Sequence, residues 1–262
     1  FLYKYFLFLS FFTITLFFFL QSIDKINLKN LILFALFTAL SINLRIFAVF
    51  LPVLFFFILI LKTIYKNNFY EEAKKISVYL FFLILFTYIF WPYLWSSPLK
   101  SFLLLFQSLG NDLIKVKVLY YNNFVPNRSL PNTYILNWMM ITTPVLQIVF
   151  FFVGYFLCIL RIAKRFIKIK NRSIYNDLWR GNKERTDFTL FFILTSFFLI
   201  FLLSNAPFYN GWRLVYFFNI FIIYFAIYTF NFFLSYAKNS HLKIRGLIFI
   251  ILITIGYNFV AV

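Results

Sequence analysis

Two arginines stand out as residues that could do chemistry, because each is set among apolar and aromatic side chains. Arg45 interrupts an apolar stretch that runs from about residue 30 to residue 61. A guanidinium at the centre of a bilayer costs at least about 2.5 kcal/mol, so Arg45 must reach an interface, an anionic partner or a water-filled cavity. Arg213 closes the polar segment 205–213 between two apolar runs. We treat both as candidate binding residues, with a structural ion pair for Arg45 and a snorkelling anchor for Arg213 as the alternatives.

The second feature is the segment 90–144, the only long stretch that is neither continuously apolar nor strongly basic. Its two ends carry the aromatic residues Trp91, Tyr93, Tyr134 and Trp138. Connections between helices are normally a handful of residues, and longer ones are usually functional. We therefore expect any chemistry to face the loop 96–136. The alternative is a belt of tryptophan and tyrosine at the membrane surface, which is the more frequent use of such residues.

The elements that position these residues are membrane helices. The chain is 63% hydrophobic and only 12% charged, whereas charged residues alone make up about 25% of a soluble domain. Repeated apolar runs approaching twenty residues predict an all-α, polytopic transmembrane helical bundle of about eight helices, and the alternating segments of a β-barrel are absent. We expect residues 1–262 to be a single transmembrane domain from a longer chain, crossing the cell (inner) membrane several times. The first expected helix covers residues 1–21, and two shorter helices that meet near Arg45 share the stretch from about 30 to 61. The others cover residues 77–89, the stretch from Pro144 to about 160, 188–203, the stretch from Arg213 to about 236, and a final span from residue 246.

The placement of charge orients this bundle. Of the 25 lysines and arginines, 18 fall in alternate connections, half of them in the basic loop 161–187. The positive-inside rule assigns these connections to the cytoplasm and puts the loop 96–136, Arg213 and Arg45 near the outer face. The net charge of +18 is thus a topology signal, and we expect no nucleic-acid partner. Asp112 is the only acidic residue on the outer side, where a solvated helix start is its alternative role.

Four segments, in this order along the chain, resemble those of bacterial membrane glycosyltransferases of family 39. They are residues 40–46 (LSINLRI), 90–98 (FWPYLWSSP), 130–144 (LPNTYILNWMMITTP) and 208–217 (FYNGWRLVYF). That family is related to dolichyl-phosphate-mannose protein mannosyltransferases and lipid A aminoarabinose transferases, and it has the GT-C fold.

The resemblance implies transfer of a sugar from a polyprenyl-phosphate-linked donor to a lipid, glycan or protein acceptor on the outer face. It implies that Arg45 or Arg213 contacts the donor phosphate. The implied substrate-binding residues are Arg45, Trp91, Tyr93, Tyr134, Trp138, Tyr209, Trp212 and Arg213. The family's essential acidic residue follows its first helix, and no such loop exists in this sequence, so we expect it upstream of residue 1. No cofactor is indicated, and a divalent metal is left open.

Two other classes of protein remain as alternatives to an enzyme. A transporter or flippase of lipid-linked sugars would also be a polytopic bundle that contacts membrane lipids. Transporters usually show internal repeats and helices broken by glycine or proline, and this chain has no clear repeat and only 6 glycines. A non-catalytic membrane scaffold also stays open, because no catalytic acid is visible.

Overall fold

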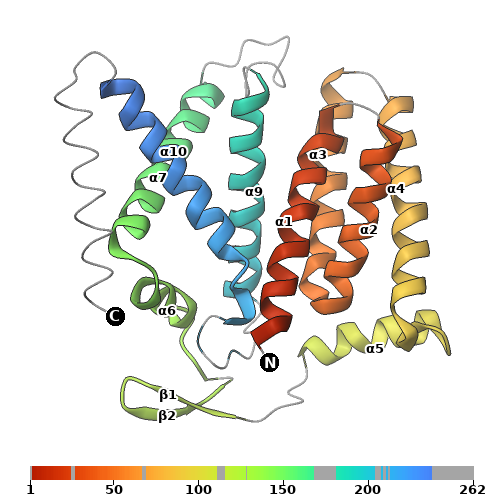
Figure 1. The fold of residues 1–262 in the computed structure, drawn as a ribbon, viewed down its shortest axis with the longest axis horizontal. Coiled ribbons are helices and arrows are strands. Elements are labelled where there is room, and N and C mark those ends of the chain that lie inside the picture. The colour runs from red at the N-terminus through yellow and green to blue at the C-terminus, as the bar shows by residue number, and fades with distance from the viewer. Residues whose placement is uncertain are drawn as a thin grey trace.

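The structure of the protein is a computed structural model, and it describes residues 2–24, 27–66, 69–110, 116–127, 129–167, 181–203, 208, 211 and 213–237. Within these ranges the chain forms nine α-helices and one β-hairpin (Figure 1). The helices are α1 (Leu2–Asp24), α2 (Leu28–Leu44), α3 (Phe50–Lys66), α4 (Phe69–Phe90), α5 (Pro98–Gly110), α6 (Tyr134–Thr142), α7 (Val145–Ile167), α9 (Asn182–Leu203) and α10 (Phe218–Ala237). The strands are β1 (Lys117–Tyr120) and β2 (Asn123–Pro126), and short 3₁₀ turns cover Ile46–Val49, Pro92–Leu94 and Arg213–Val215.

Five of these helices, α1, α4, α7, α9 and α10, are long and apolar enough to cross a membrane. The apolar helices α2 and α3 are shorter, and α2 packs between α1 and α4. Seven of the eight expected helices are therefore present as helices, and the final span from residue 246 lies outside the described residues. The structure is that of an all-helical membrane protein with one small hairpin added.

The long helices alternate in direction, so the bundle has two distinct ends (Figure 1). We call the end that carries α5, the hairpin and α6 the hairpin end. The start of α1, the α2–α3 junction and the 3₁₀ turn Arg213–Val215 lie at this same end. We call the other the basic end, where α7 and α10 finish and α9 begins. Arg45 and Arg213 therefore share the hairpin end, as the pattern of charges predicts.

Prolines mark where the elements begin. Pro98 is the first residue of α5, Pro92 starts the 3₁₀ turn Pro92–Leu94, and Pro144 directly precedes α7. Proline suits these places because the first turn of a helix leaves its N–H groups unpaired in any case. Much of the loop expected over residues 96–136 is therefore regular secondary structure. It contains α5, which runs across the end of the bundle in Figure 1, and then the hairpin.

Phenylalanine rings join the two halves of the bundle. Phe12 of α1 is fully buried, and its ring lies 4.7 Å from Phe217 and 6.1 Å from Phe197. Midway along the two helices, Phe57 of α3 stacks on Phe192 of α9 at 5.2 Å. Edge and offset ring contacts of this kind stabilise by about 0.5–1.5 kcal/mol each beyond the area they bury. The abundant phenylalanines thus form an interlocking seam between α1–α4 and α9–α10.

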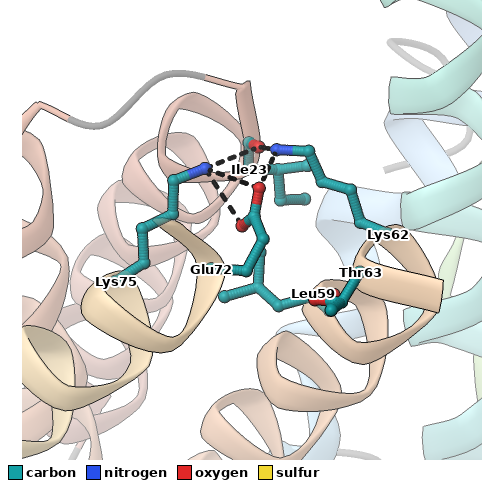
Figure 2. A network of polar contacts seen from close by, with 6 residues as sticks. All are labelled: Ile23, Leu59, Lys62, Thr63, Glu72 and Lys75. Atoms are coloured by element: carbon teal, nitrogen blue, oxygen red, sulfur yellow. Dashed lines mark hydrogen bonds and ion pairs between the residues drawn. The ribbon is translucent and has the colours of Figure 1, made fainter. Parts of the chain in front are cut away.

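One boundary differs from the prediction for a physical reason. The charged residues between the third and fourth expected helices, 62–75, predict a polar connection, yet α3 extends to Lys66 and α4 already begins at Phe69. Figure 2 shows that three charged side chains of this segment, those of Lys62, Glu72 and Lys75, turn inward and pair with one another. Lys62 Nζ lies 2.7 Å from Glu72 Oε1, and Lys75 Nζ lies 3.1 Å from Glu72 Oε2. All three side chains are buried.

The same cluster fixes the end of α1. Lys62 Nζ donates to the carbonyl oxygen of Ile23 at 2.6 Å, and Lys75 Nζ donates to it at 3.4 Å (Figure 2). Carbonyl groups in the last turn of a helix have no partner within the helix and carry partial negative charge, so two ammonium groups suit them. The Lys62–Glu72–Lys75 cluster therefore ties together the ends of α1, α3 and α4.

Candidate functional site

The site at the hairpin end is assembled around the short helix α6. Its first residue, Tyr134, is almost fully buried, and its hydroxyl accepts a hydrogen bond of 3.0 Å from the backbone N–H of Gly211. Burial raises the pKa of the Tyr134 hydroxyl above its ordinary value, so it remains protonated at neutral pH. This contact joins two segments that are 77 residues apart in the sequence. They are the two segments that carry the motifs 130–144 and 208–217.

The hairpin docks on the same helix. The Asn137 amide Nδ2 donates to the Tyr120 hydroxyl at 2.5 Å, and the Tyr120 ring lies 5.4 Å from the Tyr134 ring. The hairpin turn places Tyr121 and Asn122 at positive φ values of 44° and 64°. Positive φ at both central residues is what a two-residue turn needs to match the twist of its strands. Asn137 and Tyr134 thus hold β1 against α6.

Gly211 is required where it stands. Its φ is +69°, in the left-handed region that glycine adopts without cost. A Cβ atom at this position would lie 3.3 Å from Trp138 Cδ2, so the backbone of residue 211 passes directly over the Trp138 ring. Gly211 of the 208–217 motif and Trp138 of the 130–144 motif are therefore in direct contact.

These segments border an open cavity of about 490 Å³. It is lined by Val116, Lys117, Val118, Leu119, Tyr134, Trp138, Thr142, Gly211, Arg213 and Tyr216. Its walls offer two cationic side chains, Lys117 and Arg213, beside three aromatic rings. No carboxylate is found among these lining residues. Such a surface is suited to an anionic group that also carries a flat or ring-shaped portion.

Arg45 lies at the same end but not in the wall of this cavity. Its guanidinium is 4.8 Å from the centre of the Tyr5 ring, a cation–π contact with the first turns of α1. The next residue, Phe6, packs edge-on against Tyr216 at 6.3 Å, and Tyr216 lines the cavity. Arg45 is therefore connected to the cavity through α1 rather than exposed in it.

Trp91 and Tyr93 occupy a different place, the corner between α4 and α5. This corner and the hairpin lie on opposite sides of the bundle in Figure 1. Asn43 Nδ2 donates to the carbonyl oxygen of Phe90 at 2.7 Å, which ties the corner to the end of α2. The indole Nε1 of Trp95 donates to the Tyr88 carbonyl at 2.7 Å. Neither Trp91 nor Tyr93 lines the cavity that contains Tyr134, Trp138 and Arg213.

The remaining sequence candidates Tyr209, Trp212 and Asp112 lie outside the described residues. Conversely, four residues of the site were missed in the sequence: Lys117, Tyr120, Asn137 and Tyr216. Asn137 stands inside the 130–138 motif, so the motif itself was the available signal. No signal in the sequence pointed to Lys117, because only the folded hairpin brings this residue to the cavity.

No group of three or more metal-binding side chains occurs among the residues that the structure describes. The chain matches no family model, no curated protein and no solved structure. The geometry of this cavity and the motif resemblance are therefore the two indications of its function.

Proposed function

We propose that this chain is part of an integral membrane glycosyltransferase of the GT-C type in the cell (inner) membrane. It moves a sugar from a polyprenyl-phosphate-linked donor to a lipid, glycan or protein acceptor, and it does so at the hairpin end, which faces the periplasm. One observation carries the proposal. The cavity brings Tyr134 and Trp138 from one motif together with Gly211 and Arg213 from another.

The chemistry of the cavity supports a phosphate-linked sugar. A guanidinium can hold two phosphate oxygens at once, and Arg213 is an exposed side chain on the cavity wall. Lys117 supplies a second positive charge on the same wall, which would stabilise the phosphate as it leaves the sugar. Trp138 and Tyr216 provide ring surfaces for the sugar, and about 490 Å³ is within the usual size of a small-molecule site, about 300–1,000 Å³.

The acceptor must lose a proton as the glycosidic bond forms, and a carboxylate is the usual base for this step. The cavity walls supply no carboxylate, so we assign the base to an acidic residue outside the described part of the chain. In this proposal the chain described here positions the donor, and a further segment completes the catalytic site.

A sugar-transfer assay in membranes that contain the full-length protein tests the proposal. Radiolabelled polyprenyl-phosphate sugars serve as donors, and the variants are Arg213→Gln and Arg213→Lys. Loss of a charge-assisted phosphate contact should lower transfer about tenfold to a hundredfold in Arg213→Gln. Arg213→Lys keeps the charge but loses the bidentate contact, so its rate of transfer should lie between those of the wild type and Arg213→Gln.

The matched control is Lys100→Gln, which removes an exposed cation from α5 at the same end without touching the cavity. Equal activity of Arg213→Gln and Lys100→Gln would contradict the assignment of Arg213. Absence of transfer with every donor, together with movement of the labelled lipid between leaflets, would replace the proposal by the transporter alternative.

A further inference from the structure

A second cavity, of about 640 Å³, lies at the basic end between α7, α9 and α10. It is lined by Arg161, Lys183, Glu184, Thr186, Asp187, Tyr224, Ile227, Tyr228, Asn231 and Phe232. The bundle separates it from the cavity at the hairpin end (Figure 1), so the proposed sugar transfer does not account for it.

Both carboxylates in its wall are already paired. Asp187 Oδ2 lies 2.8 Å from Arg161 Nη2, and Asp187 Oδ1 accepts a 2.5 Å hydrogen bond from the Tyr224 hydroxyl. Glu184 Oε1 lies 2.8 Å from Arg165 Nη2. Since each acid is neutralised by an arginine, neither is available to bind a cationic ligand.

Three polar groups of the wall remain without a hydrogen-bond partner among the described residues: Lys183 Nζ, the Tyr228 hydroxyl and the Asn231 amide. All three can donate, and the ammonium of Lys183 can do nothing else. The Arg161 guanidinium lies 5.4 Å from the Tyr228 ring centre and so holds that ring in place. A ligand rich in acceptor oxygens and carrying negative charge fits this set of donors, as a phosphate does.

The cavity is also bordered by apolar side chains. Ile227 is 53% exposed and Phe232 is 46% exposed, and both belong to its α10 wall. Arg161 lies in the last two turns of α7 and Lys183 in the first turn of α9, where helices long enough to cross a membrane reach its surface. The donors therefore lie at the level of lipid headgroups, with apolar surface beside them for acyl chains.

From this arrangement we propose that the cavity binds the phosphate headgroup of one anionic glycerophospholipid. Lys183, Tyr228 and Asn231 donate to the phosphate oxygens, and Ile227, which precedes the α10 donors on the side of the bilayer centre, contacts the acyl chains. The surrounding sequence favours an anionic ligand as well, because residues 161–187 contain nine basic and three acidic residues. A zwitterionic headgroup would leave its ammonium group without a free carboxylate.

Native mass spectrometry of the purified full chain in detergent tests the proposal by counting retained lipid molecules. The probes are phosphatidylglycerol, phosphatidylcholine with the same acyl chains, and glycerol 3-phosphate. We expect one phosphatidylglycerol molecule to bind at least tenfold more tightly than phosphatidylcholine. Lys183→Gln should weaken it about tenfold, the effect of losing one charge-assisted hydrogen bond. Tyr228→Phe keeps the ring beside Arg161 and should cause a smaller loss.

Lys164→Gln is the control, because Lys164 is an exposed lysine of α7 at the same end that does not line the cavity. Equal weakening by Lys164→Gln and Lys183→Gln would mean diffuse attraction between charges and would overturn the proposal. Equal binding of the two lipids would overturn it as well. If glycerol 3-phosphate bound as tightly as phosphatidylglycerol, the site would be one for free phosphate compounds and not for a lipid.

Discussion

The buried cluster of Lys62, Glu72 and Lys75 makes a sharp prediction about stability. Glu72→Gln preserves the size and shape of the side chain and removes only its charge. In the wild-type protein the two ammonium groups share one carboxylate. In the variant they would face each other with only the Ile23 carbonyl oxygen between them. The ends of α1, α3 and α4 should separate as a result.

The magnitude follows from the distances. At an effective dielectric constant of about 20, contacts of 2.7 and 3.1 Å correspond to about 6 and 5 kcal/mol of Coulomb attraction. Much of this attraction is offset by the cost of taking three charges out of water. Removing one partner of a buried ion pair costs about 3–5 kcal/mol, because the other charge is left uncompensated. We expect Glu72→Gln to lower the free energy of unfolding by that amount.

Reversible unfolding in mixed detergent micelles, followed by circular dichroism, measures this loss. The chain supplies its own control in Glu71→Gln, since Glu71 is the exposed neighbour in the same helical turn and should not change stability. Adding Lys62→Met to Glu72→Gln should recover part of the loss, because it removes one unpaired buried ammonium. A stability of Glu72→Gln equal to that of wild type would refute this account of the cluster.

Two further predictions concern glycines. Gly154→Ala places a Cβ atom 2.2 Å from the Phe225 carbonyl oxygen, so it should lower the unfolding free energy by about 1–3 kcal/mol in the same assay, although alanine favours helices. Ala163→Leu, on the exposed face of the same helix, should not. Gly211→Ala should cost about 1–2 kcal/mol, because alanine resists the left-handed backbone at residue 211. Gly211→Asn should cost less, and a larger loss in the asparagine variant would argue against backbone strain as the cause.

The sequence predicted the long helices well, because apolar runs ended by charge or proline need nothing but local information. It also indicated that Tyr134, Trp138 and Arg213 belong together, through motifs at the same predicted face. Their contact partners could not be predicted in the same way. Tyr120 reaches Asn137 only because the hairpin folds back onto α6, and no periodicity in a sequence records such docking.

The surroundings of several charged residues also differ from those that the sequence predicts. Lys62, Glu72 and Lys75 suggest a solvated connection, since lysine and glutamate are seldom fully buried unless they are paired. Their pairing depends on the approach of α3 to α4, which the sequence does not show. Arg45 illustrates the same limit. Its need for a partner was clear, but the partner is the ring of Tyr5, an aromatic face and not an anion.

Gly154 sets the position of one wall of the basic-end cavity. Here the backbone of α7 lies directly against α10, since a Cβ atom at residue 154 would meet the Phe225 carbonyl oxygen at 2.2 Å and the Thr229 hydroxyl oxygen at 2.5 Å. The Thr229 hydroxyl also donates across this contact to the Phe150 carbonyl oxygen at 2.6 Å. Phe225 and Thr229 alternate along α10 with Tyr224 and Tyr228, which line the cavity. The close approach of the two helices at Gly154 therefore determines how far Tyr224 and Tyr228 stand from α7.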